Sequence, residues 1–171
     1  MLAHISPRRL IRHLASSPHR LRRALPPAAL ERVAQAIRQA EAGHQGEIRF
    51  LIEAALPWSY LRRNARPRER ALMMFSKLRV WDTEHNNGVL LYVNLADRAV
   101  EIIADRGIAA RVPRATWQAI CHTARDHFRS GRIEAGAIAA IQAIGAVLAE
   151  HFPLAPGESR GNELPDQPVL L

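Results

Sequence analysis

Hydrophobic residues change their spacing along the first half of the chain. From Pro27 to about Glu41 they recur every three or four positions, which predicts an amphipathic helix ended by Gly43. From Glu47 to Glu53 they alternate with charged residues, which is typical of a half-buried strand. After the break at Leu56-Pro57-Trp58, a helical period returns from about residue 66 to residue 78. This half therefore predicts helix, strand and helix in that order.

The second half begins with two strands. Val89 to Val93 is a nearly continuous apolar run, as expected for a central strand buried on both faces. The short connection 96–98 leads to a second strand, Ala99 to Ala104, so these two strands must form an antiparallel hairpin. A much longer segment with a helix joins residues 47–53 to the apolar run, and this length suits a right-handed parallel crossover.

Two more helices complete the pattern. Pro113 opens the first, and an apolar stripe from Ile133 to Leu148 marks the second. We therefore predict an α/β fold, in which α-helices sandwich a small central mixed β-sheet with a parallel crossover and one antiparallel hairpin. Residues 1–25 are expected to form a basic N-terminal arm and residues 26–153 a single domain. Prolines and glycines accumulate afterwards, so residues 154–171 are expected to be a disordered tail.

Composition places the chain among globular proteins. Of its 171 residues, 48% are apolar and 23% are charged, which excludes a wholly disordered chain and a polytopic membrane protein. The longest apolar run, Ala135 to Ala149, falls short of the roughly 20 residues of a membrane span, so a buried helix is expected. Because no secretory signal is visible either, we predict a cytoplasmic protein, peripheral at the membrane if the arm binds there. An organellar transit peptide is a less favoured interpretation of residues 1–25.

The net charge of +8 is concentrated in the arm, which contains arginines but no acidic residue. A basic arm can bind nucleic acid phosphates or anionic lipid headgroups, whereas a solvated end that binds nothing is the simpler interpretation. Nucleic acid is the least expected partner, because no aromatic-rich basic face accompanies the arm. We expect an unidentified protein partner and, through residues 1–25, a weak contact with an anionic membrane surface.

Standard sequence signatures give no reaction. Nucleotide-phosphate loops, zinc motifs and serine nucleophile elbows are absent from the sequence. The single cysteine, Cys121, excludes an internal disulfide, and its place on an apolar stripe indicates a core residue rather than a nucleophile. The remaining candidate chemistry lies in one polar loop.

That loop, Asp82 to Gly88, is the densest cluster of ligand-type side chains. The first oxygen-bearing side chains of this loop are spaced like the first ligands of an EF-hand calcium loop. However, the glycine comes one residue late, and Val93 occupies the position of the bidentate glutamate, so the loop is not an EF-hand. The loop either gives two or three oxygen ligands to a hard cation or only caps and turns the backbone. His85, the histidine within it, is a candidate for acid–base chemistry.

Several segments in a fixed order resemble the TPM domain family. They read Glu47-Ile48-Arg49-Phe50, Asn86-Asn87-Gly88-Val89-Leu90-Leu91, Ala96-Asp97-Arg98-x-Val100-Glu101-Ile102 and Asp105-Arg106-Gly107-Ile108. The stretch from Phe128 to Gly136 resembles the usual ending of that family. The resemblance covers about residues 27–152, and this chain is similar to a short bacterial-type member without a signal peptide.

The resemblance implies an α/β sandwich, a phosphatase activity and a divalent cation such as calcium or magnesium. Many members are membrane-anchored or exported, and many carry Thr-Gly-x-Gly where this chain has Asp105-Arg106-Gly107. The polar positions that the resemblance transfers are Asn86, Asn87, Asp97, Asp105 and Gly107. Local chemistry adds Asp82 and Glu47 as candidates.

From these residues we expect a site at the ends of sheet strands, where open α/β folds bind ligands. Asp82, Asn86 and Asp105 are the candidate metal ligands, and Arg106, Arg49 and Asn87 are the candidates for contacting a phosphoryl group. A bound cation would polarise a phosphate ester and activate water. Each residue also has a purely structural alternative as a turn, cap or backbone element, with Gly107 supplying an unusual backbone angle.

Two functions stay open for a TPM-like domain of unassigned role. One is a weak phosphatase that depends on calcium or magnesium. The other is a non-catalytic accessory module that docks on a membrane-associated or assembly partner.

Overall fold

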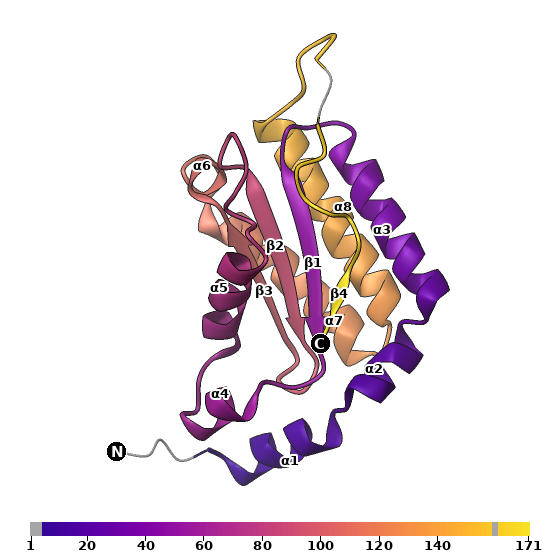
Figure 1. The fold of residues 1–171 in the computed structure, drawn as a ribbon, viewed down its shortest axis with the longest axis vertical. Helices are drawn as coiled ribbons and strands as arrows, with labels where there is room; N and C mark the ends of the chain where they lie inside the picture. The colour runs from indigo at the N-terminus through magenta and orange to yellow at the C-terminus, as the bar shows by residue number, and fades with distance from the viewer. Residues whose placement is uncertain (1–4, 159–160) are drawn as a thin grey trace.

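A four-stranded mixed sheet forms the centre of the computed structural model, which describes residues 5–158 and 161–171 (Figure 1). The strand order is β3-β2-β1-β4, with bounds Glu47–Glu53 for β1, Gly88–Asn94 for β2, Ala99–Ala104 for β3 and Val169–Leu170 for β4. β1 runs parallel to both β2 and β4, whereas β2 and β3 are antiparallel. The predicted α/β class, the parallel pairing and the hairpin are therefore confirmed.

Helices cover both faces of this sheet. Residues of α3 (Pro27–Glu41), α7 (Arg114–Arg129) and α8 (Ile133–His151) share one core with the strands, and α5 (Pro67–Lys77) packs on a second core across the sheet. Two short helices, α4 (Trp58–Arg62) and α6 (Arg106–Ala109), lie at opposite ends of the sheet (Figure 1). The sandwich expected from the hydrophobic pattern is thus present.

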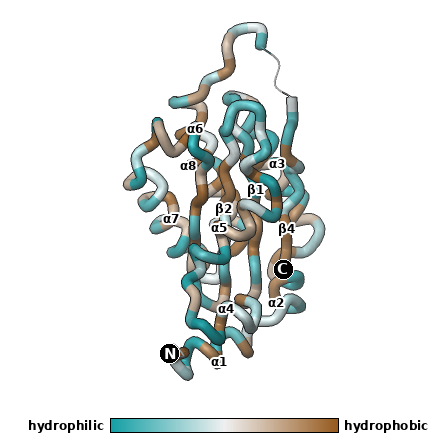
Figure 2. Tube along the Cα trace, turned by 60° about the vertical axis from the view of Figure 1, so that its left-hand side comes forward, coloured by the Kyte–Doolittle hydropathy of each residue, from teal (hydrophilic) through white to brown (hydrophobic). Residues whose placement is uncertain are grey.

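β1 is buried along its whole length, although a half-buried strand was expected. Ile48, Phe50 and Ile52 face the core of α3, α7 and α8, while Leu51 faces the core of α5. The alternating charged residues are also buried, because α5 and the C-terminal segment cover the second face. In Figure 2 the hydrophobic colouring concentrates along the central strands, which agrees with a double-sided core.

α8 is a core helix with a small-residue surface. Within the described part of the chain it is long and apolar enough to cross a membrane by length and composition, and 39% of its most apolar window is buried. Its buried stripe packs against α3 and α7, and a Cβ added at Gly145 would lie 2.7 Å from Cβ of Ala40. The small residues therefore allow a close approach of α8 to α3, as a buried helix requires.

The N-terminal arm is helical and packed, so the solvated end expected from its charge is wrong for the described residues. Two helices, α1 (Pro7–Ala15) and α2 (Pro18–Ala24), are each capped by a serine side chain and each begin with proline. Leu21 and Leu25 are buried in the main core. Residues 1–4 lie outside the described part.

The C-terminal residues 161–171 are also ordered by specific contacts, which corrects the expected disordered tail. Leu164 is buried in the core of α5, and β4 pairs with β1. The Glu47 carboxylate accepts hydrogen bonds from the N–H groups of Glu163 and Leu164. These contacts of the C-terminal segment do not require a regular spacing of hydrophobic residues, so the hydrophobic pattern of the sequence did not predict them. Residues 159–160 of the expected tail lie outside the described part.

Candidate functional site

The predicted site residues lie at two opposite ends of the sheet. The loop 82–88 leads into β2 and faces α6, which follows β3, so it lies at the amino ends of the parallel strands. Asp97 lies in the hairpin beyond the carboxyl end of β2, at the other end of β3. Because open α/β folds bind ligands beyond the carboxyl ends of their strands, the predicted loop is at the less usual end.

At the amino end, four predicted residues do meet. Arg106 Nε donates a hydrogen bond of 3.1 Å to Asn86 Oδ1, and Asp105 Oδ1 accepts one of 2.7 Å from the Arg106 backbone N–H. A Cβ on Gly107 would lie 2.6 Å from the Asn86 carbonyl oxygen. Gly107 is therefore required by a close backbone approach, since its φ is not positive as the unusual-angle alternative supposed.

Asp82 and His85 do not complete a metal cluster with these residues. The Asp82 side chain is exposed and lies 3.9 Å from Arg79. His85 lines a separate cavity of about 200 Å³ together with Glu84 and Glu158. Among the described residues, no three or more His, Cys, Asp or Glu side chains are placed together to hold a metal ion.

Glu47, Arg49 and Asn87 instead fix the backbone around the start of β1. The buried Arg49 guanidinium donates to the carbonyls of Pro165 and Gln167, and its burial lowers the pKa of Arg49. Asn87 Nδ2 donates to the Gln45 carbonyl. The contacts of Glu47 and Arg49 therefore explain how the C-terminal segment is held against β1.

The donor set of the amino end is only partly suited to a cation. Two buried oxygens there, Asn87 Oδ1 and Asp105 Oδ2, accept no hydrogen bond from residues 5–158 or 161–171, and such oxygens suit calcium or magnesium. However, the Arg106 guanidinium binds Asn86 Oδ1, which is the atom that a cation would need. Calcium takes six to eight oxygen ligands, so the residues as arranged do not fit a resident cation.

The carboxyl end carries a buried charge network that was not predicted. Arg70 on α5 binds the Glu53 carboxylate, with the shortest contact of 2.6 Å from Nη2 to Oε1. The Tyr92 hydroxyl donates a hydrogen bond of 2.7 Å to Glu53 Oε2, and burial together with the nearby Glu53 carboxylate raises the pKa of Tyr92. The charged and polar groups of Arg70, Glu53 and Tyr92 therefore satisfy one another within the buried network.

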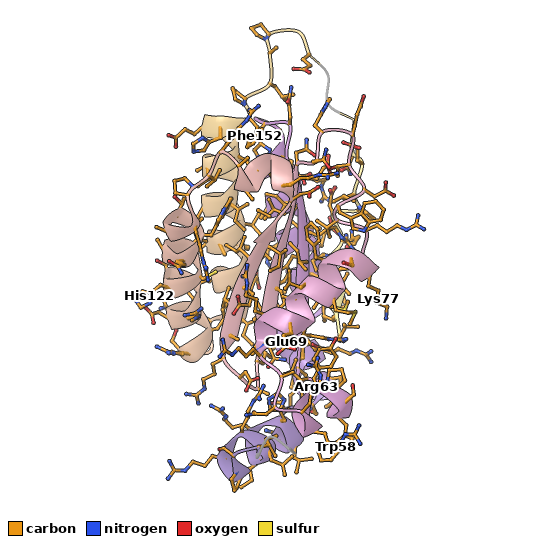
Figure 3. The ribbon with its side chains drawn as sticks, turned by 90° about the vertical axis from the view of Figure 1, so that its left-hand side faces the viewer. Trp58, Arg63, Glu69, Lys77, His122 and Phe152 are labelled. Atoms are coloured by element: carbon orange, nitrogen blue, oxygen red, sulfur yellow. The ribbon has the colours of Figure 1, made fainter. Side chains whose placement is uncertain are left out.

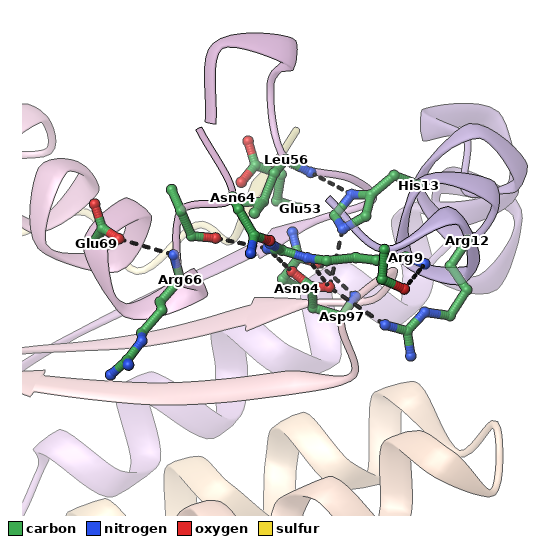
Figure 4. Close-up of polar contacts among 12 residues, drawn as sticks. Arg9, Arg12, His13, Glu53, Leu56, Asn64, Arg66, Glu69, Asn94 and Asp97 are labelled. Atoms are coloured by element: carbon green, nitrogen blue, oxygen red, sulfur yellow. Dashed lines mark hydrogen bonds and ion pairs between the residues drawn. The ribbon is translucent and has the colours of Figure 1, made fainter. Parts of the chain in front are cut away.

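α1 closes the same end of the sheet from outside (Figure 4). The Arg9 guanidinium binds the Asp97 carboxylate at 3.0 and 2.7 Å and also binds Asn64 Oδ1. His13 Nδ1 accepts the backbone N–H of Leu56 at 3.1 Å, while its Nε2 lies 3.1 Å from Asp97 Oδ1. Asp97 thus holds α1 against this end of the sheet.

The pKa of Asp97 reflects this role. Burial alone would raise the pKa, but the hydrogen bonds from Arg9 and the nearby His13 side chain outweigh burial and hold the pKa of Asp97 below its usual value. An Asp97 that is ionised at neutral pH is the form that binds Arg9. Asp97 was a predicted site residue at this end, and the positions of Glu53 and Asn94 at the ends of their strands are the sequence signal that could have indicated the other polar groups.

Comparison with known proteins places the fold in a family. A family model described as the TPM domain matches residues 21–147. The chain belongs to the TPM domain family. A solved structure with the same fold is the NMR structure of the BA42 protein from the psychrophilic bacterium Bizionia argentinensis. This TPM chain is 28% identical to it, with a TM-score of 0.74, over 86% of this chain and 95% of that chain.

A search among curated proteins found no match. The family match begins at residue 21, so α1 lies before the matched region. The helix that closes the carboxyl end of the sheet is therefore not part of the family match.

Proposed function

We propose that this TPM domain is a non-catalytic docking module that binds anionic membrane surfaces through the end formed by α1, α2 and α4. The observation that carries the proposal is the outer face of α1, where Ile11 and Leu14 are 64% and 75% exposed. They lie three positions apart and therefore on one side of the helix. A helix that exposes apolar residues among arginines has the composition of an interfacial membrane helix.

α1 is held so that this face stays outward. Arg9 and His13 anchor the opposite side of the helix to Asp97 and to the backbone at Leu56. Because the inner face makes charged and hydrogen-bonded contacts, Ile11 and Leu14 have no route into the core without breaking them. The apolar pair is thus presented by the fold rather than left over by a disordered end.

Positive charge surrounds the apolar pair. The exposed arginines of α1 and α2 are Arg8, Arg12, Arg20, Arg22 and Arg23. The described residues of both helices include no acidic side chain. Each basic residue near an anionic bilayer contributes about 1 kcal/mol of attraction, which makes this end the favoured one for such a surface.

α4 adds an aromatic side chain at the same end of the molecule (Figure 1). Trp58 is its first residue and is 62% exposed, and it follows Leu56, whose backbone binds His13 of α1. Tryptophan is enriched where membrane meets water, because its ring is apolar and its N–H remains hydrated. Trp58 therefore fits the same use as Ile11 and Leu14.

The phosphatase hypothesis has weaker support. Asn86 and Asp105 do converge, but Arg106 occupies Asn86 and Asp82 pairs with Arg79 instead. Cys121 is buried, and burial raises the pKa of its thiol to about 11, so it is not a thiolate nucleophile at neutral pH. A docking role needs none of these groups.

Co-sedimentation with vesicles tests the proposal. The full chain is expected to sediment with phosphatidylglycerol-rich vesicles and to remain in solution with pure phosphatidylcholine. Ile11→Glu with Leu14→Glu should abolish sedimentation, because it places two acids in the interface. Arg8→Glu with Arg12→Glu should weaken it and make the remaining binding less dependent on salt, because fewer screened charge contacts are left.

The matched control is Leu72→Glu, which changes a leucine that is 48% exposed on α5, away from α1. It should sediment like the wild type. Equal sedimentation of the Ile11/Leu14 variant would contradict the proposal, as would a wild type that binds a DNA oligonucleotide but no vesicles. Circular dichroism confirms that each variant retains its helices.

A further inference from the structure

A cleft of about 590 Å³ follows the edge of the sheet, and its lining residues come from β3, the start of α5 and α7 rather than from α1. Its floor is β3 from Val100 to Ile102, and its walls are the start of α5 and the outer side of α7. Figure 3 looks onto this flank, with His122 of α7 on one side of the strands and Glu69 of α5 on the other. β3 is the last strand of the sheet on this side.

The cleft is strongly basic. Four arginines line it, namely Arg66, Arg68, Arg114 and Arg125. Glu101 is the acidic residue among its lining residues, and it pairs with Arg68 at 3.2 Å. Arg125 Nη2 donates to the Val100 carbonyl at 3.3 Å, which orients this guanidinium over the strand. After the one ion pair, a surplus of positive charge remains.

The positions of these arginines are unfavourable for helix stability alone. Arg114 is the first residue of α7, whose first turn contains no acidic residue, and Arg66 is the N-cap of α5. Cations at a helix N-terminus oppose the helix dipole. Together with the free N–H groups of α7, which has 16 residues, Arg114 instead strengthens a positive potential that attracts anions.

The cleft also has an apolar floor. Val100, Ile102 and Trp117 contribute apolar surface beneath the arginines. The volume lies within the range of about 300–1,000 Å³ that is typical of small-molecule sites. Planar guanidinium groups match the oxygens of phosphoryl groups with paired hydrogen bonds.

We infer that this cleft is a binding site for a small molecule with two or more phosphoryl groups, such as a nucleoside di- or triphosphate. The phosphoryl oxygens contact arginines that line the cleft, and the apolar part of the ligand lies over Ile102 and Trp117. Binding is non-covalent, since Cys121 below the cleft is buried and burial raises the pKa of its thiol to about 11, so that it stays protonated at neutral pH.

Isothermal titration calorimetry on the full chain, without vesicles, tests the site. ATP is expected to bind more tightly than ADP, and ADP more tightly than inorganic phosphate, because each added phosphoryl group gains charged contacts. Arg114→Ala with Arg125→Ala should weaken ATP binding by about a hundredfold, since each lost charge-assisted contact accounts for about tenfold. Arg114→Glu alone, which leaves Arg125 on Val100, should weaken it by at least about tenfold.

Arg129→Ala is the matched control, because Arg129 is exposed on the same helix but does not line the cleft. It should bind ATP like the wild type. An equal loss in this control, unchanged ATP binding in both cleft variants, or a wild type that does not bind ATP would each overturn the inference.

Two further arms separate the cleft from the membrane-docking end. The Arg114/Arg125 variant should still sediment with phosphatidylglycerol vesicles, and the Ile11/Leu14 variant should still bind ATP. Loss of vesicle binding in the cleft variant would show that lipid headgroups are the phosphate source and would overturn the small-molecule assignment.

Discussion

At the scale of single residues, Gly107 shows how one missing side chain shapes the amino end of the sheet. A Cβ there would lie 2.6 Å from the Asn86 carbonyl oxygen and 2.9 Å from that of His85. Real Cβ atoms do not approach backbone oxygens so closely, so the loop and α6 would have to separate.

We therefore expect Gly107→Ala to destabilise the protein by about 1–3 kcal/mol. Urea unfolding followed by circular dichroism measures the change. Gly43→Ala is the control, because a Cβ at Gly43 meets no atom within 4 Å. It should stay within about 0.5 kcal/mol of the wild type. A Gly107→Ala variant as stable as the control would show that the loop moves away freely.

Buried charged residues are the part of a site that the hydrophobic and polar pattern of the sequence does not predict. Asn86 and Asp105 became candidates through the family resemblance, and their positions at neighbouring strand ends led to the expectation that they converge with Arg106. The pair Glu53 and Arg70 could not be found in this way, because the two residues lie on different elements and their hydropathy indicates exposure. Only packing of α5 on the sheet brings them together.

At the scale of elements, periodic burial explains which parts of the fold were predictable. The helices 27–41, 67–77, 114–129 and 133–151 and the three long strands have one face or two faces in a core, and hydrophobic spacing records this. The packing of α1 is not visible in the hydrophobic spacing, because polar side chains, those of Arg9 and His13, form its inward face. β4 has two residues, too few to show any period.

The attachment of α1 also predicts a dependence on pH. The pKa of Asp97 is lower in the folded protein than in the unfolded chain, so its contribution to stability is present above about pH 4 and is lost as the pH falls through the folded value. Asp97→Asn should destabilise the protein at pH 7 by about 1.5–3 kcal/mol, because charged hydrogen bonds to Arg9 are lost.

Urea midpoints of wild type and Asp97→Asn, compared across acidic and neutral pH, measure this effect. The gap should narrow as the pH falls below about 4, where the carboxyl of the unfolded wild type is protonated, and should close once the pH is below the lowered pKa of folded Asp97. Asp126→Asn is the control, because that carboxylate is exposed and lies 3.7 Å from Arg129. A gap of constant size at every pH would contradict a charged role for Asp97.

At the scale of the whole molecule, the two ends of the sheet have different chemistry. The carboxyl end is closed by α1 and by paired charges, and it turns an apolar and basic surface outward. The amino end combines the Arg106 guanidinium with oxygens of Asn87 and Asp105 that accept no hydrogen bond within the described part of the chain. The docking proposal and the phosphatase hypothesis therefore assign function to opposite ends of one domain, and a single variant series distinguishes them.

Removing Arg106 decides what the amino end binds. In the wild type we expect no thermal shift with calcium up to about 1 mM, the weak end of natural calcium sites, because a guanidinium occupies Asn86 Oδ1. Arg106→Ala frees that oxygen beside Asp105 and should produce a calcium-dependent rise in Tm, which Asp105→Asn in the same background should remove. Arg79→Ala is the control, since it frees Asp82 alone.

A wild type stabilised by calcium or magnesium, with phosphate-ester hydrolysis that requires Asp82 and Asp105, would instead establish the phosphatase hypothesis and refute a non-catalytic domain. Vesicle binding by the same variants should remain unchanged, because Arg106 and Ile11 lie at opposite ends of the sheet.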